Sequence, residues 1–189
     1  LTNRDHLRQL DITKAGQYPL AVVLSCMDSR VHANMIFDLG LGDMFSVRVA
    51  GNIVSEEALG SMEYGCAVAG AKVIVVLGHT RCGAVNATVD ALADETKQPD
   101  NKCNNLPAIT GPIAEAVAAE TVTGENRDSA NSDFVQRVTR LNVRHAIRNV
   151  HQHSNKLQEM IDAGDVLLCG GIYDVESGQV TFIEAEPSP

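Results

Sequence analysis

The sequence predicts a three-layer α/β domain with a mostly parallel sheet of four strands, an antiparallel edge strand, and helices on both faces. Three observations support this fold class. Short apolar runs alternate with longer helical patterns along the chain, a hairpin pattern lies near its end, and there is no internal repeat. With 189 residues, the chain has the length of a single domain, expected here to span 1–189.

Four apolar segments are predicted as strands because each is short and is bounded by turn-forming or polar residues. They cover residues 20–25, 44–49, 72–78 and 165–170. Two further extended segments, 172–175 and 180–183, flank the turn sequence Glu176-Ser177-Gly178-Gln179 and predict a hairpin. The continuous runs 20–25 and 72–78 are typical of strands buried on both faces of a parallel sheet.

Helices are predicted between the strands. Ser55, followed by Glu56 and Glu57, indicates the start of a helix that continues to residue 69. Apolar periodicity predicts further helices over 83–93 and 112–119, and one or two amphipathic helices over 134–160. Polar residues over 94–105 and 123–131 predict loops.

Composition excludes several classes of function. The chain has 15 Lys and Arg against 24 Asp and Glu, a net charge of -9, which disfavours binding to nucleic acid or to an anionic membrane surface. Its apolar runs fall short of the roughly 20 residues that span a bilayer, so no membrane insertion is expected. We expect a soluble protein, with the cytoplasm favoured and a periplasmic or organellar location open if a leader was removed.

The five cysteines are odd in number and widely spaced, which favours reduced thiols or metal thiolates over a disulfide framework. Cys26 follows the first predicted strand, and His79 and Cys82 follow the third. Because ligands bind beyond the carboxyl ends of parallel strands, these three side chains could converge on one point. Two thiolates and one imidazole form a zinc site with one open position, which is typical of catalytic zinc.

Each of these residues also has an ordinary structural interpretation. A lone Cys at a strand end is usually a small buried apolar residue, and His-x-x-Cys is only a moderately specific pattern. Because Cys26 and the His79-x-x-Cys82 pair occur together at two strand ends, the metal site is favoured. Asp28 and Arg30, two and four residues beyond Cys26, strengthen this interpretation further.

The two motifs together, Cys26-x-Asp28-x-Arg30 and His79-x-x-Cys82, resemble the beta class of carbonic anhydrases. The resemblance runs from about residue 16 to about residue 184. It implies one Zn²⁺ per chain and the reversible hydration of CO₂ to bicarbonate and a proton, by attack of zinc-bound hydroxide. It also implies a homodimer or a dimer of dimers.

The resemblance assigns roles to individual residues. Asp28 is expected to accept a hydrogen bond from the zinc-bound hydroxide, and Arg30 to hold the Asp28 carboxylate ionised through a two-pronged hydrogen bond. Four further positions match substrate-binding residues of the family. They are Gln17 and Gly83, which would donate to substrate, and Phe45 and Tyr64, which would wall the pocket from across a dimer interface.

The chain departs from the family pattern at three places. Ala50 stands where many plant-type members have Val, which could widen the pocket or alter its selectivity. The family's N-terminal helix, which clasps the partner subunit, is expected to be missing here. Val23 stands where the bicarbonate-regulated subgroup has Trp, which argues against that form of inhibition.

Three other functions remain open from the sequence. The same zinc site could hydrolyse a related heterocumulene such as CS₂ or COS, or the chain could be a catalytically silent zinc-binding regulatory module. Thiol catalysis by Cys26 is disfavoured, because a phosphatase cradle needs Arg six residues after the Cys and His32 occupies that position.

Overall fold

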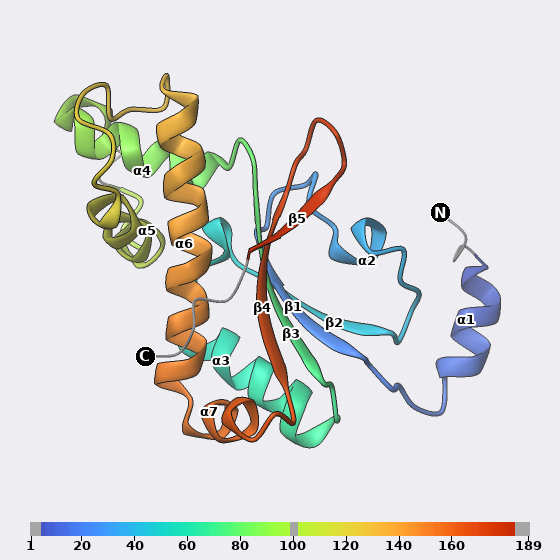
Figure 1. Cartoon of the computed structure of the whole chain (residues 1–189). Helices are drawn as coiled ribbons and strands as arrows, with labels where there is room; N and C mark the ends of the chain where they lie inside the picture. The colour runs from blue at the N-terminus through green and yellow to red at the C-terminus, as the bar shows by residue number, and fades with distance from the viewer. Residues whose placement is uncertain (1–4, 99–101, 184–189) are drawn as a thin grey trace.

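The computed structural model describes residues 5–98 and 102–183, and its centre is a five-stranded sheet in the order β2-β1-β3-β4-β5 (Figure 1). Four neighbouring strands are parallel: β1 (Ala21–Ser25), β2 (Met44–Arg48), β3 (Val73–His79) and β4 (Leu167–Tyr173). The edge strand β5 (Val180–Ile183) pairs antiparallel with β4. The predicted sheet is confirmed.

The prediction was wrong about the length of the fourth strand. A strand ending at Gly170 and a separate strand beginning at Ile172 were expected, but β4 is continuous through Gly170 and Gly171. A Cβ atom at Gly170 would lie 2.8 Å from Val143 and 2.7 Å from Ile147. Gly170 therefore allows a helix to pack closely on the strand and does not end the strand.

The connections place the crevice of the sheet at β1. The chain passes from β1 to β2 on one side and then to β3 on the other, so the strand order reverses at β1. In open α/β sheets, ligands bind at the carboxyl ends of the strands where the order reverses. The segments that follow β1 and β3 lie at that point.

One face of the sheet is covered by α6 (Ser132–His153), α3 (Glu56–Glu63) and α7 (Asn155–Asp162) (Figure 1). The predicted amphipathic region is two helices, because Ser154 ends α6 and its hydroxyl accepts from the Leu157 amide at 3.1 Å to begin α7. Although α6 has 22 residues, no helix in 5–98 or 102–183 combines the length and apolar character needed to cross a membrane.

A second cluster of buried apolar residues forms beside the sheet, where α4 (Gly83–Ala93) and α5 (Pro107–Ala119) pack on α6. Cys26 and Cys82 belong to this cluster. The start of α5 differs from the prediction: the helix begins at Pro107, five residues before the expected Pro112. Pro107 occupies the first turn, where its missing N–H is not needed, and Pro112 is accommodated inside the helix.

The opposite face of the sheet carries a thinner layer. The four-residue helix α2 (Ala33–Ile36) and the residues around it cover Val23, Val75 and Leu77. An eight-residue helix, α1 (His6–Thr13), stands off from this side and buries none of its residues (Figure 1). Neither helix was predicted, because both are short and their apolar spacing is weak.

The helix predicted over 55–69 has a change of geometry in its second half. Ser55 caps α3 as expected, with its hydroxyl accepting from the Ala58 amide at 3.3 Å. The regular helix ends at Glu63 and continues as a π-helical segment, Tyr64–Val68. Gly65 lies in this segment, where a Cβ atom would come within 2.5 Å of Val22, so close packing on β1 requires a glycine there.

A buried carboxylate joins α5 to α6. Glu120 is 3% exposed and follows the last residue of α5. Its carboxylate accepts from Arg127 at 2.7 Å, from Arg137 at 2.9 Å and from the Thr123 hydroxyl at 3.0 Å. Burial acts to raise the pKa of Glu120, but the hydrogen bonds from Arg137 and Thr123 outweigh it and the net pKa is lowered.

We predict that Glu120→Gln lowers the free energy of unfolding at neutral pH by about 1–3 kcal/mol, because two arginines lose their charged acceptor. The pKa of Glu120 is lower in the folded state than in the unfolded state, so its contribution is present above the ordinary value of 4.5 and is lost as pH falls below it. Urea unfolding at neutral pH and near pH 4 measures both effects.

The control is Glu125→Gln, the same chemical change at an exposed position of the same loop. It should change the free energy of unfolding by less than about 0.5 kcal/mol. Equal destabilisation by the two variants would contradict the role assigned to Glu120.

Candidate metal centre

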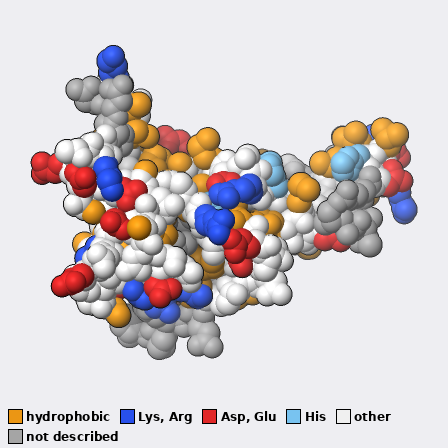
Figure 2. All heavy atoms as spheres, turned by 90° about the horizontal axis from the view of Figure 1, so that it is seen from above, with side chains coloured by type: hydrophobic (Ala, Val, Ile, Leu, Met, Phe, Trp, Pro, Cys, Tyr) orange, Lys and Arg blue, Asp and Glu red, His pale blue; other side chains and the backbone are white. Residues whose placement is uncertain are grey.

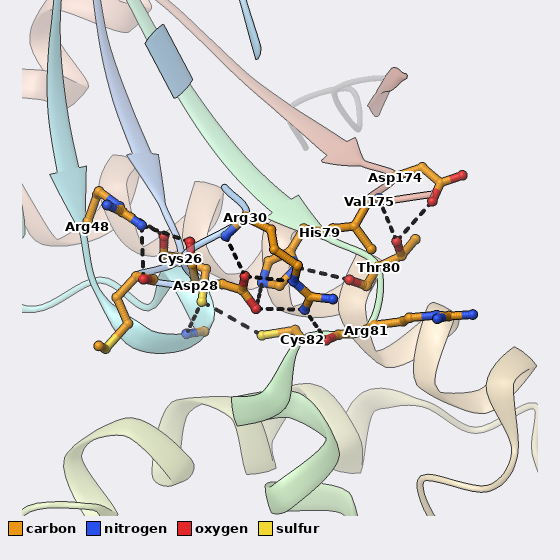
Figure 3. Close-up of polar contacts among 12 residues, drawn as sticks. Cys26, Asp28, Arg30, Arg48, His79, Thr80, Arg81, Cys82, Asp174 and Val175 are labelled. Carbon is orange, nitrogen blue, oxygen red and sulfur yellow. Dashed lines mark hydrogen bonds and ion pairs between the residues drawn. The ribbon is translucent and has the colours of Figure 1, made fainter. Parts of the chain in front are cut away.

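Three potential metal ligands meet at the crevice of the sheet (Figure 3). Cys26 directly follows β1, His79 is the last residue of β3, and Cys82 directly precedes α4. Their ligand atoms all lie within 4.8 Å of one another, and the two sulfur atoms are 3.9 Å apart. All three side chains are buried, so the structure brings together the residues that the sequence predicted to converge.

The geometry fits zinc. Two sulfur atoms, each about 2.3 Å from a tetrahedral zinc ion, would lie about 3.8 Å apart, which agrees with the observed 3.9 Å. His79 Nδ1 lies 2.9 Å from the Thr80 carbonyl, which can only accept, so Nδ1 carries the proton. His79 Nε2 is buried without a hydrogen-bond partner among the described residues, which leaves its lone pair for a metal.

The two thiols are within hydrogen-bond distance of each other. The pKa of Cys26 is lowered, chiefly by the hydrogen bond from the Cys82 thiol, with a further contribution from the Gly51 amide. The pKa of Cys82 is raised, because losing its proton would place two thiolates side by side in a buried space. A divalent cation removes this repulsion, as expected of a site that binds metal.

Asp28 and Arg30 lie at the edge of the three ligands. Arg30 Nε donates to Asp28 Oδ1 at 2.9 Å, Nη2 donates to Oδ2 at 2.8 Å, and the Arg30 amide also donates to Oδ1 at 2.9 Å. The Arg30 side chain holds the pKa of Asp28 well below its usual range. Asp28 Oδ2 is 4.0 Å from His79 Nε2, so an ionised acceptor stands beside the ligand cluster.

Sequence reasoning missed Arg48 and Gly51 as contributors to this centre. Arg48 donates to the backbone carbonyls of Cys26, Met27 and Asp28 at 3.3, 2.9 and 2.8 Å. The Gly51 amide donates to Cys26 Sγ at 3.3 Å. The sequence offered one signal for Arg48, namely its position. It is the last residue of β2, which pairs with β1, so it lies at the same edge of the sheet as Cys26.

The other predicted site residues occupy different surroundings. Gly83 is the first residue of α4, and a Cβ atom there would meet nothing within 4 Å. Phe45 and Tyr64 line a groove of about 660 Å³ at the β2 edge of the sheet. Gln17 is exposed between α1 and β1. Within one chain, Gln17, Phe45 and Tyr64 lie outside the hydrogen-bond network of the ligand cluster.

The face above the carboxyl ends of the strands is polar. Viewed from above, acidic and basic side chains lie next to each other near the middle of this face (Figure 2). Two ion pairs follow the strand ends: Asp28 with Arg30, and Arg81 with Glu176. The buried ligand cluster therefore lies beneath a charged and solvated rim.

Comparison with known proteins agrees with this geometry. Residues 21–180 match the family model described as carbonic anhydrase. Carbonic anhydrase 2 of Mycobacterium tuberculosis (strain CDC 1551 / Oshkosh) is 38% identical over 172 residues, which cover 89% of this chain and 76% of the relative. The carbonic anhydrase of Mycolicibacterium smegmatis is 36% identical, covering 92% and 78%.

The solved structure of the beta-carbonic anhydrase CcaA is 26% identical, with a TM-score of 0.77 over 97% of this chain and 86% of the other. The chain belongs to the beta-carbonic anhydrase family. Membership confirms the predicted enzyme class and its zinc cofactor, which the Cys26, His79 and Cys82 cluster is able to hold. The fold, activity class and cofactor of this carbonic anhydrase thus agree with what its two sequence motifs implied.

We predict that Cys26→Ser reduces bound zinc from about one ion per chain to a trace, because a serine hydroxyl is a poor replacement for a thiolate ligand. Elemental analysis of the purified protein after exposure to zinc measures this. The control is Cys103→Ser, a substitution at an exposed cysteine, which should keep about one zinc ion per chain. Full zinc content in the Cys26 variant would refute the assigned ligand set.

Proposed function

We propose that this carbonic anhydrase hydrates CO₂ reversibly, giving bicarbonate and a proton, at a zinc ion held by Cys26, His79 and Cys82. The observation that supports this most directly is His79 Nε2, which has no hydrogen-bond partner within 5–98 and 102–183 and is buried beside two sulfur atoms and an ionised Asp28. Zinc held by three protein ligands supplies a Lewis acid that activates water as a nucleophile at neutral pH.

Asp28 orients the attacking water. With Arg30 bound to both of its oxygens, the carboxylate stays ionised and can only accept hydrogen bonds. An acceptor held in one place directs the proton of the water toward Asp28 and its lone pair toward the carbon of CO₂. Arg48 supports this arrangement, because it fixes the carbonyls on either side of Met27.

Gly83 and Gln17 are proposed to bind the substrate oxygens. The Gly83 amide lies at the N-terminus of α4, where unpaired N–H groups favour developing negative charge. The open space at its Cα leaves room for a substrate to approach the backbone. Gln17 supplies a side-chain amide from the segment before β1, and we assign it to the site of a second chain.

A second copy of the chain is proposed to complete the pocket. Phe45 and Tyr64 line the groove at β2, and Tyr64 is 58% exposed. The nearby helix α1 also exposes apolar residues, namely Leu7, Leu10 and Ile12. Large exposed apolar surfaces of this kind mark protein contacts. A beta-carbonic anhydrase from Sordaria macrospora, 25% identical to this chain with a TM-score of 0.75 over 95% of it, is described as tetrameric. We therefore propose a homodimer or a dimer of dimers.

We predict that Asp28→Asn lowers kcat/KM for CO₂ hydration by about 10²–10⁴-fold, because the neutral amide loses the charged acceptor. Stopped-flow measurement on the zinc-loaded protein provides the value. The control is Asp165→Asn, at an exposed position just before β4 and at the opposite end of the sheet, which should leave kcat/KM unchanged.

Rapid turnover of the unmodified protein that a chelator abolishes would support the proposed reaction. Zinc-loaded protein that leaves CO₂ unhydrated would refute it, and the same preparation assayed with CS₂ or COS would then show whether the site serves another heterocumulene.

The proposed second copy predicts a dimer or a tetramer in solution. Sedimentation of the zinc-loaded protein measures its mass, and each chain contributes 20.2 kDa. Phe45→Glu should shift the mass toward one chain and reduce turnover together, because it places a charge where Phe45 and Tyr64 are proposed to meet the second chain. A stable monomer with full activity would contradict the roles proposed for Phe45, Tyr64 and Gln17.

A further inference from the structure

The turn between β4 and β5 is hydrogen-bonded to the segment that carries two of the three metal ligands (Figure 3). The Thr80 amide donates to the Tyr173 carbonyl at 3.0 Å. The Val175 amide donates to Thr80 Oγ1 at 3.1 Å, and Thr80 Oγ1 lies 3.1 Å from Asp174 Oδ1. Because the Val175 amide can only donate, the single proton of the Thr80 hydroxyl points toward the Asp174 carboxylate.

Asp174 is itself held in a fixed position. Its Oδ1 also accepts from the Glu176 amide at 3.0 Å, and its Oδ2 accepts from the Ser177 hydroxyl at 2.9 Å. These hydrogen bonds, led by the one from the Glu176 amide, lower the pKa of Asp174. The carboxylate is therefore an ionised acceptor at neutral pH and does not rotate freely.

The backbone at Thr80 and Arg81 contacts both a metal ligand, His79, and the Arg30 side chain that binds Asp28. The Thr80 carbonyl accepts from His79 Nδ1 at 2.9 Å, which orients the ring and directs Nε2 toward the sulfur atoms. The next residue, Arg81, has a positive φ of 57°, and its carbonyl accepts from Arg30 Nη2 at 3.2 Å. Arg30 in turn holds Asp28.

The side chain of Arg81 adds a second link to the same turn, because it pairs with Glu176. Both Arg81 and Glu176 are more than half exposed, so this pair is screened by solvent and contributes little. Thr80 and Asp174 are each only partly exposed as residues, and their side chains are joined directly by a hydrogen bond. The Thr80–Asp174 hydrogen bond is therefore the stronger of the two links.

We propose that Thr80 and Asp174 are positioning residues of the metal centre, whose hydrogen bond holds the backbone between His79 and Cys82 in the geometry that retains zinc and places Arg30. This inference rests on the proposed function for the identity of the metal ligands. Neither residue touches a ligand atom of the proposed zinc. Both act through the Thr80 carbonyl and the Arg81 carbonyl.

The experiment measures the rate at which zinc-loaded protein releases zinc to a chromogenic chelator. Thr80→Val keeps the shape of the side chain but removes the hydroxyl, so the Thr80 carbonyl that orients His79 loses its support. Zinc release should be about tenfold faster or more, the size expected when the surroundings of a metal ligand are disturbed. Thr80→Ser keeps the hydroxyl and should stay within about twofold of the unmodified protein.

Two controls separate positioning from general loss of stability. Thr88→Val removes a buried hydroxyl from α4, where it donates to the Ala84 carbonyl at 2.8 Å, and should leave zinc release unchanged. The visible absorption bands of the Co²⁺-loaded protein report ligand geometry directly. They should shift in Thr80→Val and stay unchanged in Thr88→Val.

A second pair of variants tests the carboxylate. Asp174→Ala removes the acceptor and should accelerate zinc release in the same direction as Thr80→Val. Ser177→Ala removes the contact to Asp174 Oδ2 and the long contact from the Gln179 amide, but it leaves the Thr80–Asp174 hydrogen bond in place and should not accelerate zinc release. If Thr80→Val fails to fold, the comparison of these two variants decides the question.

Equal zinc release from Thr80→Val and the unmodified protein would overturn the inference, as would equal acceleration by Thr88→Val. The proposed function fails separately, if the unmodified protein holds zinc and leaves CO₂ unhydrated. In that case the release rates still decide whether Thr80 and Asp174 position the metal ligands.

Discussion

The parallel pairing of β1 with β3 is the constraint on which the centre depends. Their register joins Ser25 to Leu77, so Cys26 emerges level with the last residues of β3. His79 lies at the end of the same strand, and the short turn after it returns Cys82 to the same point. Two strands with this register place two sulfur atoms and one imidazole together without any long-range adjustment. A shift of one residue would turn the side chains to opposite faces.

Burial gives these ligands their chemical character. Two of the three ligands, Cys26 and Cys82, belong to the second apolar cluster, which α4, α5 and α6 form beside the sheet. In that environment an unpartnered imidazole nitrogen and two close thiols are costly, and a metal ion relieves both costs. The Glu120 network contributes from a distance, because it joins α5 to α6 and so maintains the wall of the cluster.

Above the ligands, the polar groups form a connected framework of arginines and carboxylates. Arg48 donates hydrogen bonds to backbone carbonyls of the loop after β1, and Arg30 donates to the Asp28 carboxylate. The turn between β4 and β5 reaches the other side of the centre through Thr80. Each of these contacts acts on the backbone next to a candidate ligand or on the carboxylate beside the ligands. Because these contacts fix the groups around the ligands, residues at a solvated rim can keep a buried metal site in one geometry.

The sequence by itself determined the class of sheet, the three candidate metal ligands and the Asp28–Arg30 pair, because apolar runs and short motifs are local properties of the chain. It also located Ser55 as a helix cap, since capping depends on neighbouring residues. Only the tertiary structure decided that Arg48 and Asp174 belong to the centre. Their partners lie about 20 and 90 residues away, respectively, and no local pattern records such contacts. The continuous β4 and the helical course of α5 through Pro112 were decided in the same way, because packing against α6 outweighed the usual preferences of Gly170 and Pro112.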